Sequence, residues 1–266
     1  MPRYFLEVAY KGTNYSGFQS QHNANTIQAE IEKAFVILRK EKIIMTGSSR
    51  TDAGVHALQN FFHFDTNSLL HPGKELGLAH QSFSEGGYEA EFIYKMNSIL
   101  PGDIVVKKII PVAEDAHCRF DAISREYKYY IYRKKDPFLK DKAFYFPYKL
   151  DVDKLHQAAE IIKEYQDFTS FSKRNTQVKT FICEILESKW YLEKDCLVYH
   201  VKANRFLRGM VRALTATMLK IGRGKMSLDE FRDIIAAKDC TKTSFAVPGH
   251  GLFLIEVRFL PAIPSE

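Results

Sequence analysis

The amino-acid sequence predicts an α+β fold made of two similar βαβ-type halves, in which antiparallel sheets are backed by helices. Two observations predict this class. Segments that alternate apolar and polar residues, typical of strands, are interspersed with segments whose apolar residues recur every three or four positions, as on one face of a helix. The order strand, helix, strand, strand, helix, strand in the first part of the chain has a related rhythm in the second part. With 266 residues, 45% of them hydrophobic, the chain can bury a sizeable core.

The first half is expected to span residues 1–111. Its first helix has a start signal at Asn25 or Thr26, and Gln28 follows Asn25 at the spacing of a capping box. Residues 70–87 are polar and contain glycine, and their pattern predicts no regular element. The expected strands are 3–10, 42–46, 59–65 and 104–112, and the expected helices are 25–40 and 88–100.

The second half is expected to span residues 112–266. Asp151 or Asp153 marks the start of one helix, and Ser227 with Glu230 predicts a capping box at another. The expected strands are 124–134, 179–190, 196–203 and 251–259, and the expected helices are 151–165, 206–222 and 227–238. Two halves of this kind correspond to a duplicated ferredoxin-like arrangement.

Composition argues against several classes of protein. No apolar run approaches the roughly 18 residues of a membrane-spanning helix, so no membrane association is expected. The N-terminus enters a strand pattern at once, which predicts a cytoplasmic protein without a secretory leader. The cysteines are scattered without a C-x-x-C pair, so neither a metal site nor a disulfide framework is expected. A net charge of +6 permits a polyanionic partner without requiring one.

The segment GSSRTDAGVHAL, residues 47–58, is the first candidate site, because loops between strands commonly display working side chains on a rigid scaffold. Arg50 lies two residues before Asp52, and an arginine fork can orient a carboxylate for nucleophilic or general-base work. Gly54 permits a close backbone approach or a positive φ. The plainer interpretation is a turn residue beside an ordinary salt bridge. His56, at the start of a strand, is expected to be structural.

The segment REYKYYIY is the second candidate, because Tyr127 and Tyr129 share one face of the expected strand with Ile131. Packing within a sheet accounts for most of its tyrosines, since aromatic residues favour strands. A tyrosine that faces a cleft could instead stack on a nucleobase or move a proton.

Basic residues form the third candidate. Arg205, Arg208 and Arg212 are spaced three and four apart, so on one helix they would share a face, either as a solvated stripe or as a ridge that contacts phosphates. Interleaved basic and aromatic residues suit single-stranded or looped RNA. Further basic residues near the aromatic strand and in SKRNTQVK are Arg125, Lys128, Arg133, Lys134, Lys135, Lys173, Arg174 and Lys179.

At SRTDAGVHA the chain resembles the tRNA pseudouridine synthase A family. The resemblance covers nearly the whole chain in ordered blocks, which are AYKGTNYSGFQSQ, TIQAEIEKA, NSILPGDI, HCRFDAISREYKYYIY, DFTSF, NRFLRGMVR and GLFLIEV. The chain departs from the family pattern at Ser49, where glycine is usual, at Lys11, where an acid is usual, and at Phe18, where tryptophan is usual. Its segment 70–94 is also longer than is typical.

The resemblance implies an isomerase without metal or cofactor that converts uridine to pseudouridine at positions 38, 39 and 40 of the anticodon stem-loop of tRNA. It implies that Asp52 is the catalytic aspartate in a central cleft, that Arg50 pairs with it and helps to displace the base, and that Tyr127 packs on the base. It further implies a homodimer with tRNA crossing both subunits. It places Arg212 as a basic residue near the aspartate. The expected substrate-binding residues are Thr51, Arg205, Arg208, Arg212, Leu252 and Leu254.

The chemistry leaves alternatives open. A stacked uridine must be flipped out at a cost of a few kcal/mol, which phosphate contacts offset. Asp52 could then attack ribose carbon 1′, take a proton from the sugar, or attack the base. An RNA-binding module that had lost catalysis would bind tRNA without forming product. A carboxylate-dependent nucleoside hydrolase would instead release free uracil.

Overall fold

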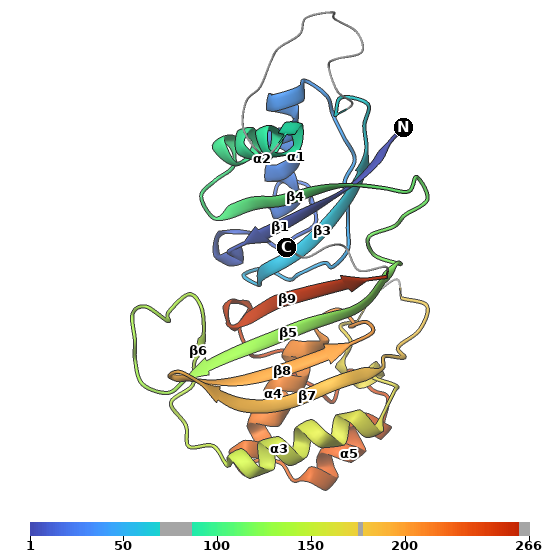
Figure 1. Ribbon diagram of the computed structural model, residues 1–266. Coiled ribbons are helices and arrows are strands. Elements are labelled where there is room, and N and C mark those ends of the chain that lie inside the picture. Colours follow the sequence, from blue (N-terminus) through green and yellow to red (C-terminus); the bar gives the residue numbers. More distant parts are fainter. Residues whose placement is uncertain (70–86, 175–177, 261–266) are drawn as a thin grey trace, which may run out of the picture.

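A single mixed sheet runs through the protein (Figure 1), which is described by a computed structural model for residues 1–69, 87–174 and 178–260. The strand order is β4-β1-β3-β9-β5-β8-β7, with β2 paired to β3 and β6 paired to β5. The strands are β1 (Arg3–Tyr10), β2 (Thr46–Gly47), β3 (His56–Asp65), β4 (Ile104–Val112), β5 (Ala122–Tyr132), β6 (Phe144–Tyr145), β7 (Ile185–Glu193), β8 (Cys196–Ala203) and β9 (Leu252–Phe259). The helices are α1 (Ile27–Arg39), α2 (Gly87–Ile99), α3 (Val152–Ile161), α4 (Met210–Gly222) and α5 (Leu228–Ala236). The expected α+β class is confirmed.

Strand β9 joins the N-terminal and C-terminal parts of the sheet, because the last strand of the chain lies between β3 and β5 (Figure 1). It runs parallel to β3 through the pairs His56–Phe253 and Ala57–Leu254, and antiparallel to β5. The other pairs along the main path are antiparallel. The first residues of β3 and β9 therefore meet in the middle of the sheet, and the loop that precedes β3 is brought to this junction.

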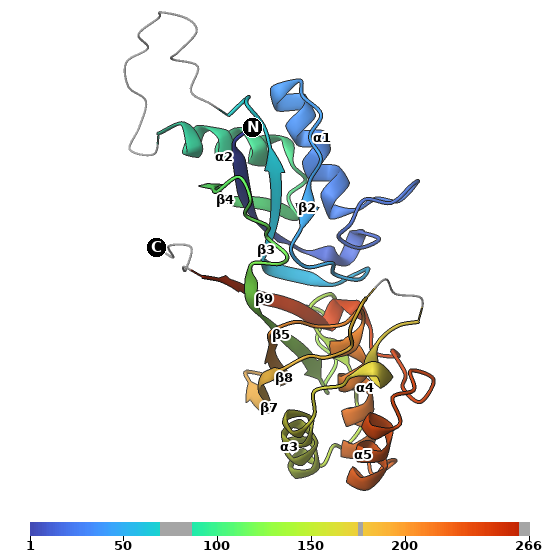
Figure 2. The same cartoon turned by 90° about the vertical axis from the view of Figure 1, so that its right-hand side faces the viewer.

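The helices bury their apolar faces against the sheet. Helix α1 buries Ile27, Ile31 and Phe35, which follow the helical period. Helix α4 is buried along most of its length, and Trp190 on β7 packs against it with Nε1 3.4 Å from Met218 Sδ. Figure 2 shows α1 beside the N-terminal strands and α4 beside the C-terminal strands, with α5 packed next to α3. In the described ranges, no helix has the length and apolarity needed to span a membrane.

Helix starts test the sequence predictions closely. The capping box at Ser227 and Glu230 is confirmed at the start of α5. The capping box expected from Asn25 and Gln28 is wrong, because Thr26 is the N-cap and its side chain accepts a hydrogen bond from Ala29 N. Gln28 instead donates to the backbone oxygen of Met45.

The helix expected at 206–222 begins later, at Met210, because Gly209 has a left-handed backbone with φ of 77°. Arg205 and Arg208 therefore precede the helix, and the single basic helix face predicted for them with Arg212 is wrong. The strand expected at 42–46 is reduced to β2, and the one expected from 179 begins at Ile185. Most of the unassigned segment 70–87 lies outside the described residues.

Candidate active site

A buried polar network centred on Asn60 of β3 holds the loop that carries Asp52. The Asn60 amide nitrogen donates to Tyr10 OH (3.1 Å) and to the backbone oxygen of Ser49 (2.9 Å). Its amide oxygen accepts from Ser48 Oγ (2.8 Å) and from Phe61 N (2.9 Å). Because both donors and both lone pairs are used in a fully buried side chain, the network gives the loop one defined path.

Thr51 ties the loop to β1 and to the turn before α1. Its hydroxyl lies 2.8 Å from Tyr10 OH, and its backbone oxygen accepts from Phe18 N at 3.1 Å. Three residues after Thr51, Gly54 has φ of 76°, as its position in the loop predicted. Asp52 thus lies between an anchored residue and a tight turn, which restricts the positions its carboxylate can reach.

The Asp52 carboxylate is held by two cations from the second half of the chain. Arg212 Nη1 on α4 lies 3.0 Å from Oδ2, and Lys173 Nζ lies 3.2 Å from the same oxygen. The Asp52 side chain is 15% exposed. Within the described residues Oδ1 accepts no hydrogen bond. One carboxylate oxygen is therefore fixed by charge-assisted contacts, and the other is left for a substrate.

Arg212 is itself fixed by the loop before β9. Its Nε donates to the backbone oxygen of Val247 (2.9 Å), and Nη2 donates to that of Phe245 (3.2 Å). The planar guanidinium thus connects α4, the segment before β9 and Asp52, a geometry that a lysine ammonium does not reproduce.

The expected pairing of Arg50 with Asp52 is wrong in this structure. Arg50 is exposed, and within the described residues it makes no ion pair with Asp52. The two cations that do contact Asp52, Lys173 and Arg212, come from elements 121 and 160 residues further along the chain.

Lys173 was seen in the sequence only as one of several basic residues, and its role beside Asp52 was missed. Its backbone nitrogen donates to the backbone oxygen of Arg208, which brings it beside the turn at Gly209. A Cβ on Gly209 would lie 2.9 Å from the Phe245 ring and 3.2 Å from Lys173 Cε. The glycine between Arg208 and Met210 was the available signal, because it permits both the positive φ and this close approach.

Tyr127 on β5 lies near the carboxylate and is 8% exposed. Its ring meets Phe206 edge-on with centroids 5.1 Å apart. The pKa of Tyr127 is raised to about 12, chiefly by burial, while the charge of Arg125 opposes the shift and that of Asp52 adds to it. The phenol is therefore protonated at neutral pH and is suited to donate a hydrogen bond or to pack on a base.

His56 is structural, as expected. It is buried, its Nδ1 accepts from Gly12 N (3.0 Å), and its Nε2 lies 3.0 Å from the backbone oxygen of His250. Burial lowers the pKa of His56, which agrees with a neutral ring that uses both nitrogens.

Leu252 and Leu254 lie at the start of β9, where β9 pairs with β3. Both are buried, and Leu254 pairs in register with Tyr127 on one side and Ala57 on the other. Their buried side chains lie where the N-terminal and C-terminal parts of the sheet meet. Across the described ranges, no group of three or more His, Cys, Asp and Glu side chains is arranged to hold a metal ion.

Comparison with known proteins finds sequence matches over most of the chain. A family described as tRNA pseudouridine synthase matches residues 7–121 and 165–260. A relative from Parabacteroides distasonis, named tRNA pseudouridine synthase A, is 44% identical over 259 residues, which cover 97% of this chain and 96% of the relative. Relatives of the same name from Porphyromonas gingivalis and Staphylococcus aureus are 40% and 33% identical, cover 97% and 96% of this chain, and are themselves covered over 97% and 90%.

Proposed function

The chain belongs to the tRNA pseudouridine synthase family, and from this premise we propose that its Asp52 carboxylate acts on a flipped uridine in the anticodon stem-loop of tRNA. The protein is an isomerase that converts uridine to pseudouridine in tRNA. The observation that carries the proposal is the Asp52 carboxylate at the junction of β3 and β9, held on one oxygen by Arg212 and Lys173.

The isomerisation breaks the bond between uracil N1 and ribose C1′ and forms a bond between uracil C5 and C1′. The C5 proton leaves and N1 gains a proton, so no cosubstrate is consumed. Asp52 acts through Oδ1, either by attack at C1′, by removal of a proton from the sugar, or by attack on the base. The protonated phenol of Tyr127 packs on the base or donates a hydrogen bond to it, because its raised pKa disfavours the phenolate.

The finer assignments rest on the resemblance of the sequence blocks. They are modification at positions 38, 39 and 40, a homodimer with tRNA crossing both subunits, and action in the cytoplasm. Arg205 and Arg208 would contact phosphates, and Leu252 and Leu254 would line the base pocket. A division into ferredoxin-like halves at residues 111 and 112 is supported by the strand order, in which β1 and β5 each lie between two antiparallel partners.

The test is the variant Asp52→Asn, assayed by release of tritium from tRNA labelled at uridine C5. Product formation should fall by about 10³-fold or more, while tRNA binding is retained, because the amide keeps the shape of the side chain and loses its charge. Asp153→Asn, an exposed position on α3, is the matched control and should keep full activity.

Mapping pseudouridines after the reaction tests the assigned positions directly. Product at uridines other than 38, 39 and 40 would refute the position assignment and leave the aspartate assignment standing. Full activity of Asp52→Asn would refute the aspartate assignment. Release of free uracil by the native protein would favour hydrolysis.

A further inference from the structure

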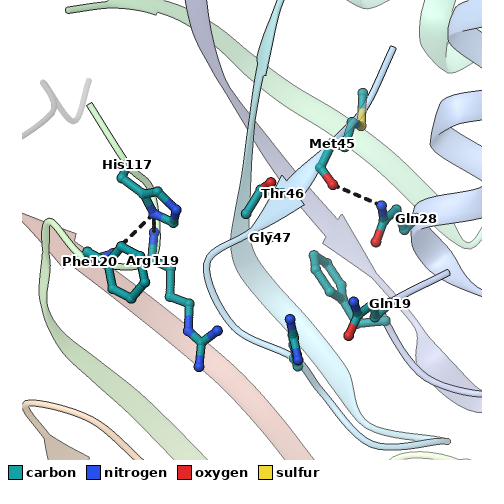
Figure 3. Close-up of a pocket in the computed structure, with 10 residues that line it drawn as sticks. Gln19, Gln28, Met45, Thr46, Gly47, His117, Arg119 and Phe120 are labelled. Carbon is teal, nitrogen blue, oxygen red and sulfur yellow. Dashed lines mark hydrogen bonds between the residues drawn. The ribbon is translucent and has the colours of Figure 1, made fainter. Parts of the chain in front are cut away.

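A cavity of about 130 Å³ lies beside the candidate active site, between the segment that leads into the Asp52 loop and the connection that leads into β5 (Figure 3). Arg50 lines it, whereas Asp52 and Tyr127 do not. Figure 3 shows His117, Arg119 and Phe120 on one side and Gln19, Gln28 and Met45 on the other. The remaining lining residues are Phe18, Thr46 and Gly47.

Two arginines, Arg50 and Arg119, line this cavity, and a third, Arg205, lies near Arg119 outside the lining. Within the described residues, Arg50, Arg119 and Arg205 make no ion pair. The pKa of Arg119 is lowered, first by burial of its guanidinium and then by the positive charges of Arg50 and Arg205, so both of these arginines lie close enough to act on Arg119. Like charges held together without a carboxylate are compensated when a phosphate binds, and guanidinium groups are the preferred partners of phosphates.

Phe120 presents an open aromatic face next to these arginines. Its side chain is 74% exposed, the His117 ring lies 4.2 Å away, and the Arg119 guanidinium lies 5.7 Å from the ring centre. Exposed aromatic rings next to cations are the elements from which proteins build stacking sites for bases in single-stranded nucleic acids.

The turn that presents Phe120 is held by several hydrogen bonds. His117 Nδ1 accepts from the backbone nitrogens of Arg119 (3.2 Å) and Phe120 (3.4 Å), as the dashed lines in Figure 3 mark. The His117 backbone nitrogen donates to Asp121 (2.6 Å), and the buried Arg125 donates to the backbone oxygen of Arg119 (2.6 Å). The exposure of Phe120 is therefore imposed by the fold.

We propose that this surface binds a second nucleotide of the RNA, one that is not isomerised, with its base stacked on Phe120 at the cavity and its phosphate between Arg119, Arg50 and Arg205. The ligand class rests on the proposed function, because that function supplies the RNA. Gln19 offers a donor and an acceptor to the base edge from the opposite wall (Figure 3).

The first test is binding of an anticodon stem-loop RNA to Phe120→Ala. Loss of one base stack should weaken binding by about 5- to 150-fold, while the single-turnover rate at saturating RNA stays within about twofold. The matched control is Tyr94→Ala on α2, since Tyr94 is also 74% exposed and does not line the cavity. It should bind RNA as the native protein does.

The second test asks which nucleotide meets Phe120. Stem-loop RNAs with one abasic site at each position around the target uridine are bound to the native protein and to Phe120→Ala. At one position the abasic site should weaken binding to the native protein and have no further effect on the variant.

Unchanged RNA binding by Phe120→Ala would overturn the proposal. It would also be overturned if, at every position, the abasic site weakened binding to Phe120→Ala as much as it weakened binding to the native protein. So would a change in the molar mass of the protein in solution with unchanged RNA binding, since that would assign Phe120 to an interface between copies of the chain. A native protein that binds RNA yet forms no pseudouridine would refute the proposed function alone.

Discussion

Two clusters of cations, Arg212 with Lys173 beside Asp52 and Arg119 with Arg205 near Arg50, differ in what the fold provides for their charge. Arg212 and Lys173 are partly buried and share the Asp52 carboxylate at 3.0 and 3.2 Å. Arg119 and Arg205 have no carboxylate partner within the described residues. The positive charge of the first cluster is compensated by Asp52 before substrate binds. In our proposal, a phosphate of the RNA compensates the charge of the second cluster.

This difference separates two jobs that the overall charge of the protein cannot separate. Cations already paired with a carboxylate orient it for chemistry and contribute little to binding a polyanion, because their charge is compensated. Unpaired cations attract phosphate and contribute little to the reaction itself. Variants in the paired cluster should therefore change mainly the rate, and variants in the unpaired cluster should change mainly the affinity for RNA.

The largest effect on the paired cluster is expected from Arg212→Gln. The change removes the contact to Asp52 and both contacts to the segment before β9, so the single-turnover rate should fall by about 10²-fold and the unfolding free energy by about 1–3 kcal/mol. Single-turnover assays measure the effect on the rate, and thermal unfolding measures the effect on stability. Arg133→Gln, at an exposed position, should leave both unchanged. A native rate for Arg212→Gln would show that the pairing is only structural.

A smaller effect is expected from Asn60→Asp, which keeps the shape of the side chain and removes its donors. The backbone oxygen of Ser49 would lose its partner and face a carboxylate, so the unfolding free energy should fall by about 1–3 kcal/mol and the rate by about tenfold. The loss of rate should lessen at acidic pH, where a protonated carboxyl can again donate.

Asn97→Asp is the matched control for that loss, because Asn97 also clamps a backbone, bonding to both N and O of Val106 away from Asp52. It should destabilise the protein by a similar amount and leave the rate of the folded protein unchanged. Equal loss of rate in both variants would mean that the Asn60 network stabilises the fold without positioning Asp52.

The smallest effect is expected on the pH dependence of stability, through His63, whose ring contacts that of His117 next to Phe120. Burial and the charge of His117, whose ring lies 4.4 Å away, lower the pKa of His63 to about 4 from an ordinary value of 6.5. Between these values the unfolded chain binds a proton that the folded protein does not, so the unfolding free energy should fall as the pH drops from 6.5 to 4. Unfolding free energies measured with denaturant across this range should depend less steeply on pH for His63→Gln than for the native protein. An unchanged slope would mean that His63 titrates normally in the fold.

The elements that the sequence predicted well are those whose signals are local. Helix α5 carries its own capping box at Ser227 and Glu230, and the strand around Tyr127 alternates as β5 does. The start of α4 was misplaced, because the helical spacing of Arg205, Arg208 and Arg212 continues across Gly209 while the backbone does not.

The candidate site was predicted only in part for the same reason. The loop and its aspartate are evident from the sequence, and the neighbour in sequence, Arg50, was the natural choice of partner. Only the resemblance to the family, and no pattern in the residues, placed Arg212 near the aspartate. The actual partners are 121 and 160 residues away, and their approach depends on β9 entering the sheet between β3 and β5. No local pattern encodes that contact.

The most direct test of the account compares Asp52→Asn with Arg119→Ala in one assay that yields both the single-turnover rate and the dissociation constant for tRNA at several salt concentrations. The account predicts that Asp52→Asn loses the rate and keeps the affinity. Arg119→Ala should keep the rate at saturation, bind more weakly, and show a salt dependence reduced by about one phosphate contact. A near-native rate for Asp52→Asn would contradict the account.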